Sequence, residues 1–524
     1  MPDWTYQPLR GIAGSVLGVR RSQRTALRML GRLSSRPVGR WFVTRAFGHR
    51  PPPAELAGSV AGIAVANRLG AMVPPEVAYD AVRALPTQGA GLIVVAPVGL
   101  SDVDAVRAAA VGRRVPVLVL TDAPEVSAAL GPYVDGVLCD DAEFVRLTSP
   151  VVADALDALE DETKAVLAAP AVLLDAGPGW FQRVAEAATP TWPTPRLADV
   201  GPDPQRWPAW WWGVCVGLGM IGAGLGAAAI TLGPVLLWYD RDYLGIDRGH
   251  LHGVNHHLVS FLQHDRITMA ATMVAIGILY TGLAYGGIRH GWPWARNALL
   301  ASGLIGFPTL LYFLGTGFVE PLHTAVAVVL FPMFLAAVWR APARPRWTIL
   351  PDGPEHERRR ALTGQLLMIT TGVGLFIGGA VVSVVGLTEV FVPSDLVFLD
   401  TTSDELETAN PRLLSFIAHD RAGFGGALMA AAVAIVMVSA WSWRRGATWV
   451  WWSLALSAIV GFLPPVLVHS HIGYTDFLHL APVYIGMLLS AIALYLARPY
   501  LCARPVESKD SVSVGSAGRR GPSS

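Results

Sequence analysis

The sequence has few charged residues. Asp, Glu, Lys and Arg make up 15% of its 524 residues, whereas soluble domains have about a quarter. Hydrophobic residues make up 52%, and the mean hydropathy is +0.44. The net charge of +1 gives no basis for binding nucleic acid. This composition predicts a membrane protein with the lipid bilayer as its main partner.

Several site motifs are missing. The three cysteines, Cys139, Cys215 and Cys502, are far apart and form no disulfide or metal-binding pattern. No Walker loop occurs, residues 55–205 contain no GxGxxG, and His264, His323, His419 and His479 take part in no His-x-x-x-His spacing. The familiar nucleotide and helical zinc motifs therefore give no guide to function, and whether the chain is an enzyme stays open.

The first 54 residues form a basic helical segment. The first 50 hold ten arginines and one acidic residue, Asp3. The stretch "LRGIAGSVLGVRRSQRTALRMLGRL" predicts one or two amphipathic helices, which can lie on an anionic membrane surface. An ordinary helix with a solvated arginine face has the same pattern, so both interpretations stay open.

Residues 55–205 have the pattern of an α/β domain. Apolar runs such as "GLIVVAPV" and "VPVLVLTD" alternate with helical stretches such as "DVDAVRAAAVG". Continuous apolar strands separated by helices favour a parallel sheet. We predict either a partial barrel or an open sheet.

The start of this region resembles a known family. After the Arg-rich helices, "AFGHRPPPAELAGSVAGIAVANRLGA" is similar to the N-terminal region of class 2 dihydroorotate dehydrogenases, a likeness that covers at most residues 5–180. It implies a flavin loop at residues 62–70, but Asn67 and Arg68 stand where the family has an Asp-Lys pair. The catalytic serine has no counterpart, and the stretch is shorter than the roughly 250 residues of a complete barrel. Neither FMN nor dihydroorotate dehydrogenase activity is expected.

The rest of the chain is predicted to cross the membrane eight times, because each apolar run has about 20 or more residues. The spans are 210–237, 258–285, 295–315, 318–339, 364–392, 413–441, 448–469 and 475–497. They form two four-helix membrane units, 206–340 and 362–500, joined by a linker at 341–361 and followed by a disordered tail at 501–524. Basic residues concentrate on one side of the spans. The positive-inside rule then predicts a multi-pass protein of the cell membrane with both termini in the cytoplasm.

The two membrane units resemble each other at an offset of 155 residues. "SFLQHDR" at Ser260 matches "SFIAHDR" at Ser415, and Asp240 and Asn255 match Asp395 and Asn410. The series predicts a tandem duplication, with a pseudo-twofold axis along the membrane normal. Asp247, and Thr402 with Glu405, are predicted to cap short helices that lie over the outer face.

The duplicated polar motifs are the candidate site. Each unit has a His-Asp-Arg triplet and, later, an acid-x-Leu-His motif, both at spans that run inward from the extracytoplasmic face. We expect each unit to gather its own five side chains into one cluster. The clusters are His264, Asp265, Arg266, Glu320 and His323, and His419, Asp420, Arg421, Asp476 and His479.

The chemistry of these clusters is open from the sequence. Charged groups inside a membrane need partners or a function, so one interpretation is a structural network in a tethering protein. The second is a small-ligand site for haem, a metal ion, a quinone or a lipid head group, with His264, His323, His419 and His479 as the metal ligands. A secondary transporter is the third. His469 and His471 are expected to be an exposed pair in a loop, and no protein partner can be named.

Overall fold

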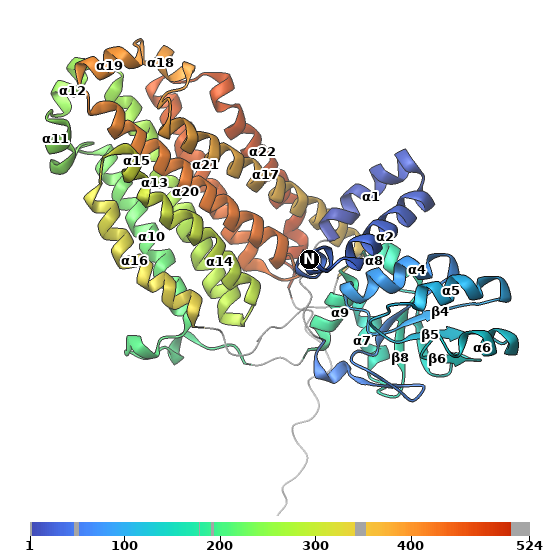
Figure 1. Cartoon of the computed structure of the whole chain (residues 1–524). Coiled ribbons are helices and arrows are strands. Elements are labelled where there is room, and N and C mark those ends of the chain that lie inside the picture. Colours follow the sequence, from blue (N-terminus) through green and yellow to red (C-terminus); the bar gives the residue numbers. More distant parts are fainter. Residues whose placement is uncertain (1–2, 47–51, 178, 190–192, 341–352, 505–524) are drawn as a thin grey trace, which may run out of the picture.

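The computed structural model describes residues 3–46, 52–177, 179–189, 193–340 and 353–504. An N-terminal α/β part lies at one end of a long helical bundle (Figure 1). We call that end of the bundle the domain-proximal end and the opposite end the distal end. The mixed fold class predicted from the sequence is confirmed.

The α/β part contains a six-stranded parallel sheet. The strand order is β6-β5-β4-β3-β8-β7, and neighbouring strands pair in parallel throughout. The strands are β3 (Leu69–Val73), β4 (Ile93–Val95), β5 (Val117–Leu120), β6 (Gly136–Leu138), β7 (Phe144–Leu147) and β8 (Ala165–Ala168). The sheet is a parallel half-barrel, in agreement with the predicted partial barrel.

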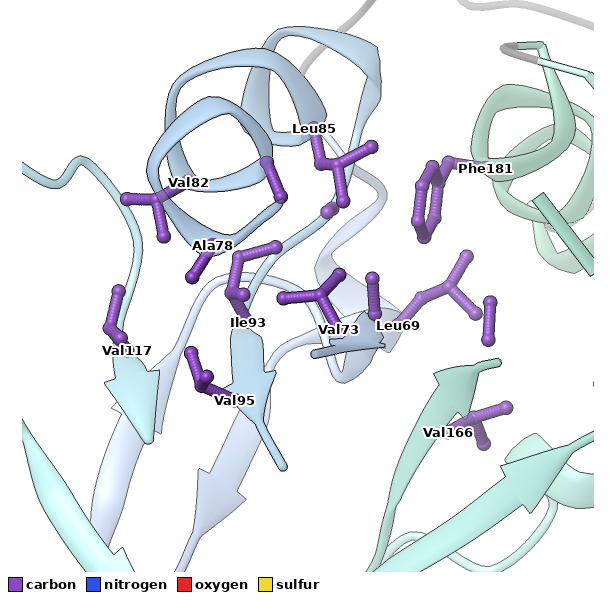
Figure 2. Close-up of a cluster of buried hydrophobic side chains, with 14 of the residues drawn as sticks. Leu69, Val73, Ala78, Val82, Leu85, Ile93, Val95, Val117, Val166 and Phe181 are labelled. Carbon is purple, nitrogen blue, oxygen red and sulfur yellow. The ribbon is translucent and has the colours of Figure 1, made fainter. Parts of the chain in front are cut away.

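Helices cover one face of this sheet. They are α4 (Pro75–Ala84), α5 (Val103–Ala110), α6 (Pro124–Leu130), α7 (Val152–Leu159), α8 (Pro170–Ala176) and α9 (Trp180–Ala188). Alternate strand residues such as Val73, Ile93 and Val95 form one buried cluster with Ala78 and Val82 of α4 (Figure 2). This alternation follows from the period of two along a strand.

A hairpin covers the other face. Strands β1 (Gly58–Val60) and β2 (Ile63–Val65) are antiparallel. Their Val60 and Val65 belong to the same buried cluster as Met72, Leu118 and Leu167 of the sheet. Apolar side chains of the hairpin therefore pack in the position where a complete barrel has its interior.

Three N-terminal helices precede the hairpin. They are α1 (Asp3–Leu17), α2 (Val19–Ser35) and α3 (Pro37–Ala46). Helix α2 packs on α4, yet Ile12, Val16, Val38 and Trp41 are all more than half exposed. An apolar surface of this kind beside many arginines is typical of helices that lie on lipid, so the membrane-surface interpretation stays a prediction.

Among the described residues, eight helical segments are long and apolar enough to cross a membrane, which fits a multi-pass membrane protein. They are α10 (Ala209–Leu232), α13 (Leu258–Gly282), α14 (Pro293–Gly306) with η8 (Phe307–Tyr312) and α15 (Phe313–Thr316), α16 (Pro321–Trp339), α17 (Glu355–Leu387), α20 (Leu413–Ser442), α21 (Thr448–Ile472) and α22 (Phe477–Leu501). Each coincides with one of the predicted spans.

Two spans differ in detail from the prediction. The third is interrupted at Phe307, where the α-helix gives way to a 3₁₀ segment, because Pro308 cannot donate the next helical hydrogen bond. The fifth begins at Glu355, inside the predicted linker, where the Glu355 carboxylate pairs with Arg358 and Arg359 one turn later. The rest of the linker, residues 341–352, and the tail from residue 505 lie outside the described residues.

Buried ion pairs attach the α/β part to the bundle. Arg358, at the start of α17, lies 3.1 Å from the Asp3 carboxylate of α1 and donates to the carbonyl of Ala176 at 2.8 Å. A second contact joins Arg444, which follows α20, to Glu186 of α9 at 2.8 Å. The α/β part therefore docks on helices of the second half of the bundle.

Arg358→Ala is expected to weaken this docking strongly. Its side chain is 2% exposed, and removing one partner of a buried ion pair costs about 3–5 kcal/mol. Arg360→Ala is the matched control, because that side chain is exposed and surface changes cost within about 0.5 kcal/mol. The apparent thermal midpoint of the full-length protein in detergent measures both. Equal midpoints for the two variants would contradict the docking.

Candidate functional site

The two His-Asp-Arg triplets lie near the starts of α13 and α20, at the distal end of the bundle (Figure 1). Short helices cover this end: α11 (Trp238–Leu244), α12 (Arg248–Val254), α18 (Pro393–Leu399) and α19 (Ser403–Ala409). Asp247 caps α12, and Thr402 with Glu405 forms a capping box on α19. The caps predicted from the sequence are confirmed.

The two covering segments exchange hydrogen bonds. The Asn255 side-chain amide donates to the carbonyl of Leu399 at 2.6 Å. Its sequence equivalent, Asn410, donates to the carbonyl of Leu244 at 2.9 Å. Reciprocal contacts between equivalent residues are what a twofold relation between two halves produces.

The triplets form crossed ion pairs between the halves. Arg266 Nε lies 2.8 Å from the Asp420 carboxylate, and Arg421 Nε lies 3.1 Å from that of Asp265. The guanidinium of Arg266 also lies 4.9 Å from the ring centroid of Phe416, and that of Arg421 lies 5.0 Å from Phe261. Each triplet therefore has its partners in the other half.

Each arginine has further partners in its own half. Arg266 donates to the carbonyl of Val235, and Arg421 to that of Val390, both at 2.7 Å. Both valines have φ of +64°, a strained conformation for a β-branched residue. Carboxylates complete the pairing: Asp240 lies 3.5 Å from Arg266, and Asp395 lies 2.6 Å from Arg421.

The histidines also pair across the halves, which differs from the expected grouping. His264 lies with His469 and His479, whereas His419 lies with Glu320 and His323. The sequence analysis grouped His264 with His323 and His419 with His479. The arrangement follows from helix packing, because α13 packs against α21 and α20 packs against α14 and α15.

We call His264, His469 and His479 the triple-histidine cluster. Their ring centroids are 4.2, 5.3 and 6.2 Å apart. His469 belongs to α21 and is 3% exposed, so the expected exposed loop pair is wrong for this residue, although His471 is exposed. His469 lies one helical turn after Pro465, which is also buried, and this burial is visible only in the packed bundle.

We call Glu320, His323 and His419 the glutamate-histidine cluster. Glu320 contacts the His323 ring directly, and the ring centroids of His323 and His419 are 6.3 Å apart. The Tyr239 hydroxyl donates to Glu320 at 3.1 Å. In each cluster the possible ligand atoms all lie within 4.8 Å of one another.

Asp476, the equivalent of Glu320, lies outside both clusters. It is exposed, and its carboxylate accepts from the backbone N–H of His479 at 2.7 Å as the cap of α22. His469 supplies the third member of the triple-histidine cluster instead. Both clusters thus have three possible ligands but reach that number with different residues.

Buried acids outnumber buried arginines at this end of the bundle. Asp240, Asp265, Asp395 and Asp420 are at most 4% exposed, and the Glu320 side chain is 14% exposed. Arg266 and Arg421 are the cations that pair with the four aspartates. Burial raises the pKa of Asp240 to about 6, with Arg266 opposing the shift, as expected where positive charge is in short supply.

Two cavities adjoin the glutamate-histidine cluster. The polar cavity has a volume of about 290 Å³, and its polar lining consists of Thr231, Tyr239, Asp240, Arg266, Glu320, His323 and Asp420. The apolar cavity, about 110 Å³, is lined by His323, His419 and by apolar residues that include Met220, Ile276 and Phe307. His323 lines both cavities, and neither is lined by a member of the triple-histidine cluster.

Comparison with known protein families, with curated proteins and with solved structures finds no match to this chain. The resemblance to dihydroorotate dehydrogenases therefore stays a prediction based on the residues quoted for it.

Arg266→Gln is expected to reduce the folded yield sharply, because it leaves Asp240 and Asp420 buried without their cation, at a cost of about 3–5 kcal/mol. Adding Asp420→Asn should recover part of the loss by removing one of those charges. Arg248→Gln is the control, since Arg248 is exposed and donates to a backbone carbonyl. Size-exclusion profiles of tagged protein measure the yield. A normal profile for Arg266→Gln would show that the crossed pairs are dispensable.

Proposed function

We propose that the protein is an integral membrane metalloprotein that holds two divalent transition-metal ions of the zinc type. One ion is bound by His264, His469 and His479, and the other by Glu320, His323 and His419. Three nitrogen or oxygen ligands are the usual protein contribution to a zinc centre that keeps a further position open.

The observation that carries this proposal is the state of the Nδ1 atoms in the triple-histidine cluster. His469 Nδ1 lies 2.6 Å from the carbonyl of Pro465, which only accepts, so Nδ1 carries the proton. His479 Nδ1 lies 3.3 Å from the Tyr474 hydroxyl. Metal-binding histidines have their second nitrogen held by such hydrogen bonds. His264 Nδ1 lies 3.1 Å from the Asp265 carboxylate, at ion-pair distance but without hydrogen-bond geometry.

The remaining Nε2 atoms then have lone pairs available for one cation. His469 Nε2 is buried and has no hydrogen-bond partner among the described residues. Two imidazoles bound to one tetrahedral zinc have ring centroids roughly 5 Å apart. The observed separations, from 4.2 to 6.2 Å, bracket that value.

The charge balance supports the second ion. Arg266 lies among Asp240, Glu320 and Asp420, and Glu320 also contacts the His323 ring. With all three acids ionised and His323 neutral, as a metal ligand must be, an excess of two negative charges remains. Buried charges of this kind need compensation. A divalent ion at the glutamate-histidine cluster supplies it, and the unpartnered Nδ1 of buried His419 offers a ligand.

Haem, a quinone and a lipid head group fit the triple-histidine cluster less well. A haem with two histidine ligands needs one ring on each side of a flat macrocycle, whereas three rings converge here. For a quinone or a lipid head group, the nearest arginine to this cluster, Arg421, already has two carboxylate partners. These ligands therefore account for fewer of the observed contacts than a metal ion does.

The positive-inside rule supports an orientation in which the domain-proximal end faces the cytoplasm. Arg358 and Arg444 contact the α/β part at that end. Both metal sites would then lie near the extracytoplasmic face. A topology reporter fused after Gly245 should read as external, and one fused after Arg445 as internal. The reverse pattern would invert the proposed orientation.

Purified full-length protein should contain two zinc-type ions per chain by elemental analysis. His264→Gln and His323→Gln should each retain one, because glutamine removes one of three ligands from one cluster. His471→Gln is the matched control, since His471 is exposed, and it should retain two. Removal of the ions by a chelator should lower the thermal midpoint, because the ions bind the folded state.

A different result would favour a structural network of aspartates and arginines instead. In that case the purified protein would contain no metal, and the His→Gln variants would be as stable as the wild type. Metal uptake into vesicles that depends on His323 would favour a transporter.

A further inference from the structure

The two proposed metal sites differ in their surroundings, and this difference extends the proposed function. Both cavities are lined by His323, and between them they reach Glu320 and His419 as well. The triple-histidine cluster borders neither cavity. A zinc site that works on a ligand keeps an open position, and the ligand needs space through which to reach it.

Small residues on α10 make room for the polar cavity. Gly222, Gly226 and Ala227 line it, and a Cβ atom at Gly222 or Gly226 would meet no other atom within 4 Å. The positions 155 residues later hold Ile377, Val381 and Val382. The second half of the bundle therefore has larger side chains at the positions that leave space in the first.

The two cavities together have the character of a site for an amphiphile. The polar cavity presents Tyr239 and Arg266 near Glu320, whereas the apolar cavity extends among Met220, Ile276 and Phe307. His323 stands between them. A ligand with an oxygen-donor head group at the metal would place an apolar chain among the bundle helices, where water is excluded.

We propose that the metal bound by Glu320, His323 and His419 keeps a coordination position open to these cavities and takes the oxygen-donor head group of a membrane-soluble amphiphile. The ion in the triple-histidine cluster borders neither cavity and stabilises the contact between the halves. This inference rests on the proposed metal sites and names the ligand class of one of them.

Cobalt-substituted full-length protein in detergent tests the inference, because the absorption of bound Co²⁺ responds to its ligands. The probes are acetohydroxamate and octanohydroxamate, which share a head group that chelates through oxygen. Both should shift one of two cobalt spectra. The shift should persist in His264→Gln and disappear in His323→Gln. Octanohydroxamate should bind at least about tenfold more tightly, since its additional methylenes are buried.

The second half has Val381 at the position equivalent to Gly226. The variant Gly226→Val introduces the same side chain into the first half. It should retain two cobalt ions but weaken the binding of both probes, because the valine occupies part of the polar cavity beside the head group. Val381→Gly is the matched control, and it should leave the binding of both probes unchanged.

The possible failures are distinct. A protein that binds no cobalt would overturn the proposed metal sites themselves. Two bound ions with no response to either probe, a shift that survives His323→Gln, or probe binding that is unchanged in Gly226→Val would each overturn the amphiphile site while leaving the metal sites in place.

Discussion

The crossed pairs of Arg266 with Asp420 and of Arg421 with Asp265 are the interaction on which the distal end of the bundle depends. Each pair joins α13 to α20, so neither half can satisfy its own triplet. Because the charges are buried, loss of one partner is far more costly than loss of a surface pair. The covering loops add reciprocal amide hydrogen bonds between the same halves.

These pairs also place the histidines. His264 and His419 each precede a paired aspartate in the chain, so the ion pairs fix the side of the helix that each imidazole occupies. The triplet therefore combines two roles: its aspartate and arginine join the halves, and its histidine faces residues contributed by the opposite half. Because the opposite half supplies partners for the aspartate and the arginine, a strongly charged motif is accommodated inside a bundle whose outer surface is apolar.

The two halves differ in the surroundings of their clusters. The glutamate-histidine cluster contains a carboxylate and borders two cavities, whereas the triple-histidine cluster has His469 in place of a carboxylate. At the domain-proximal end, Arg358 and Arg444 tie the α/β part to the second half. The inner face of the half-barrel is covered by its own hairpin, through Val60 and Val65.

The sequence by itself determined the features that depend on local chemistry. Run length and apolarity determined the eight spans, strand patterning determined the parallel sheet, and the cap residues Asp247 and Thr402 determined short helix starts. Only the tertiary structure decided which side chains meet. The number of residues between His264 and His323 is compatible with either arrangement of the histidines. The sequence does not specify which helices become neighbours in the bundle. His469 joined the site for the same reason: its partners come from two other helices, and its burial is a property of the packed bundle.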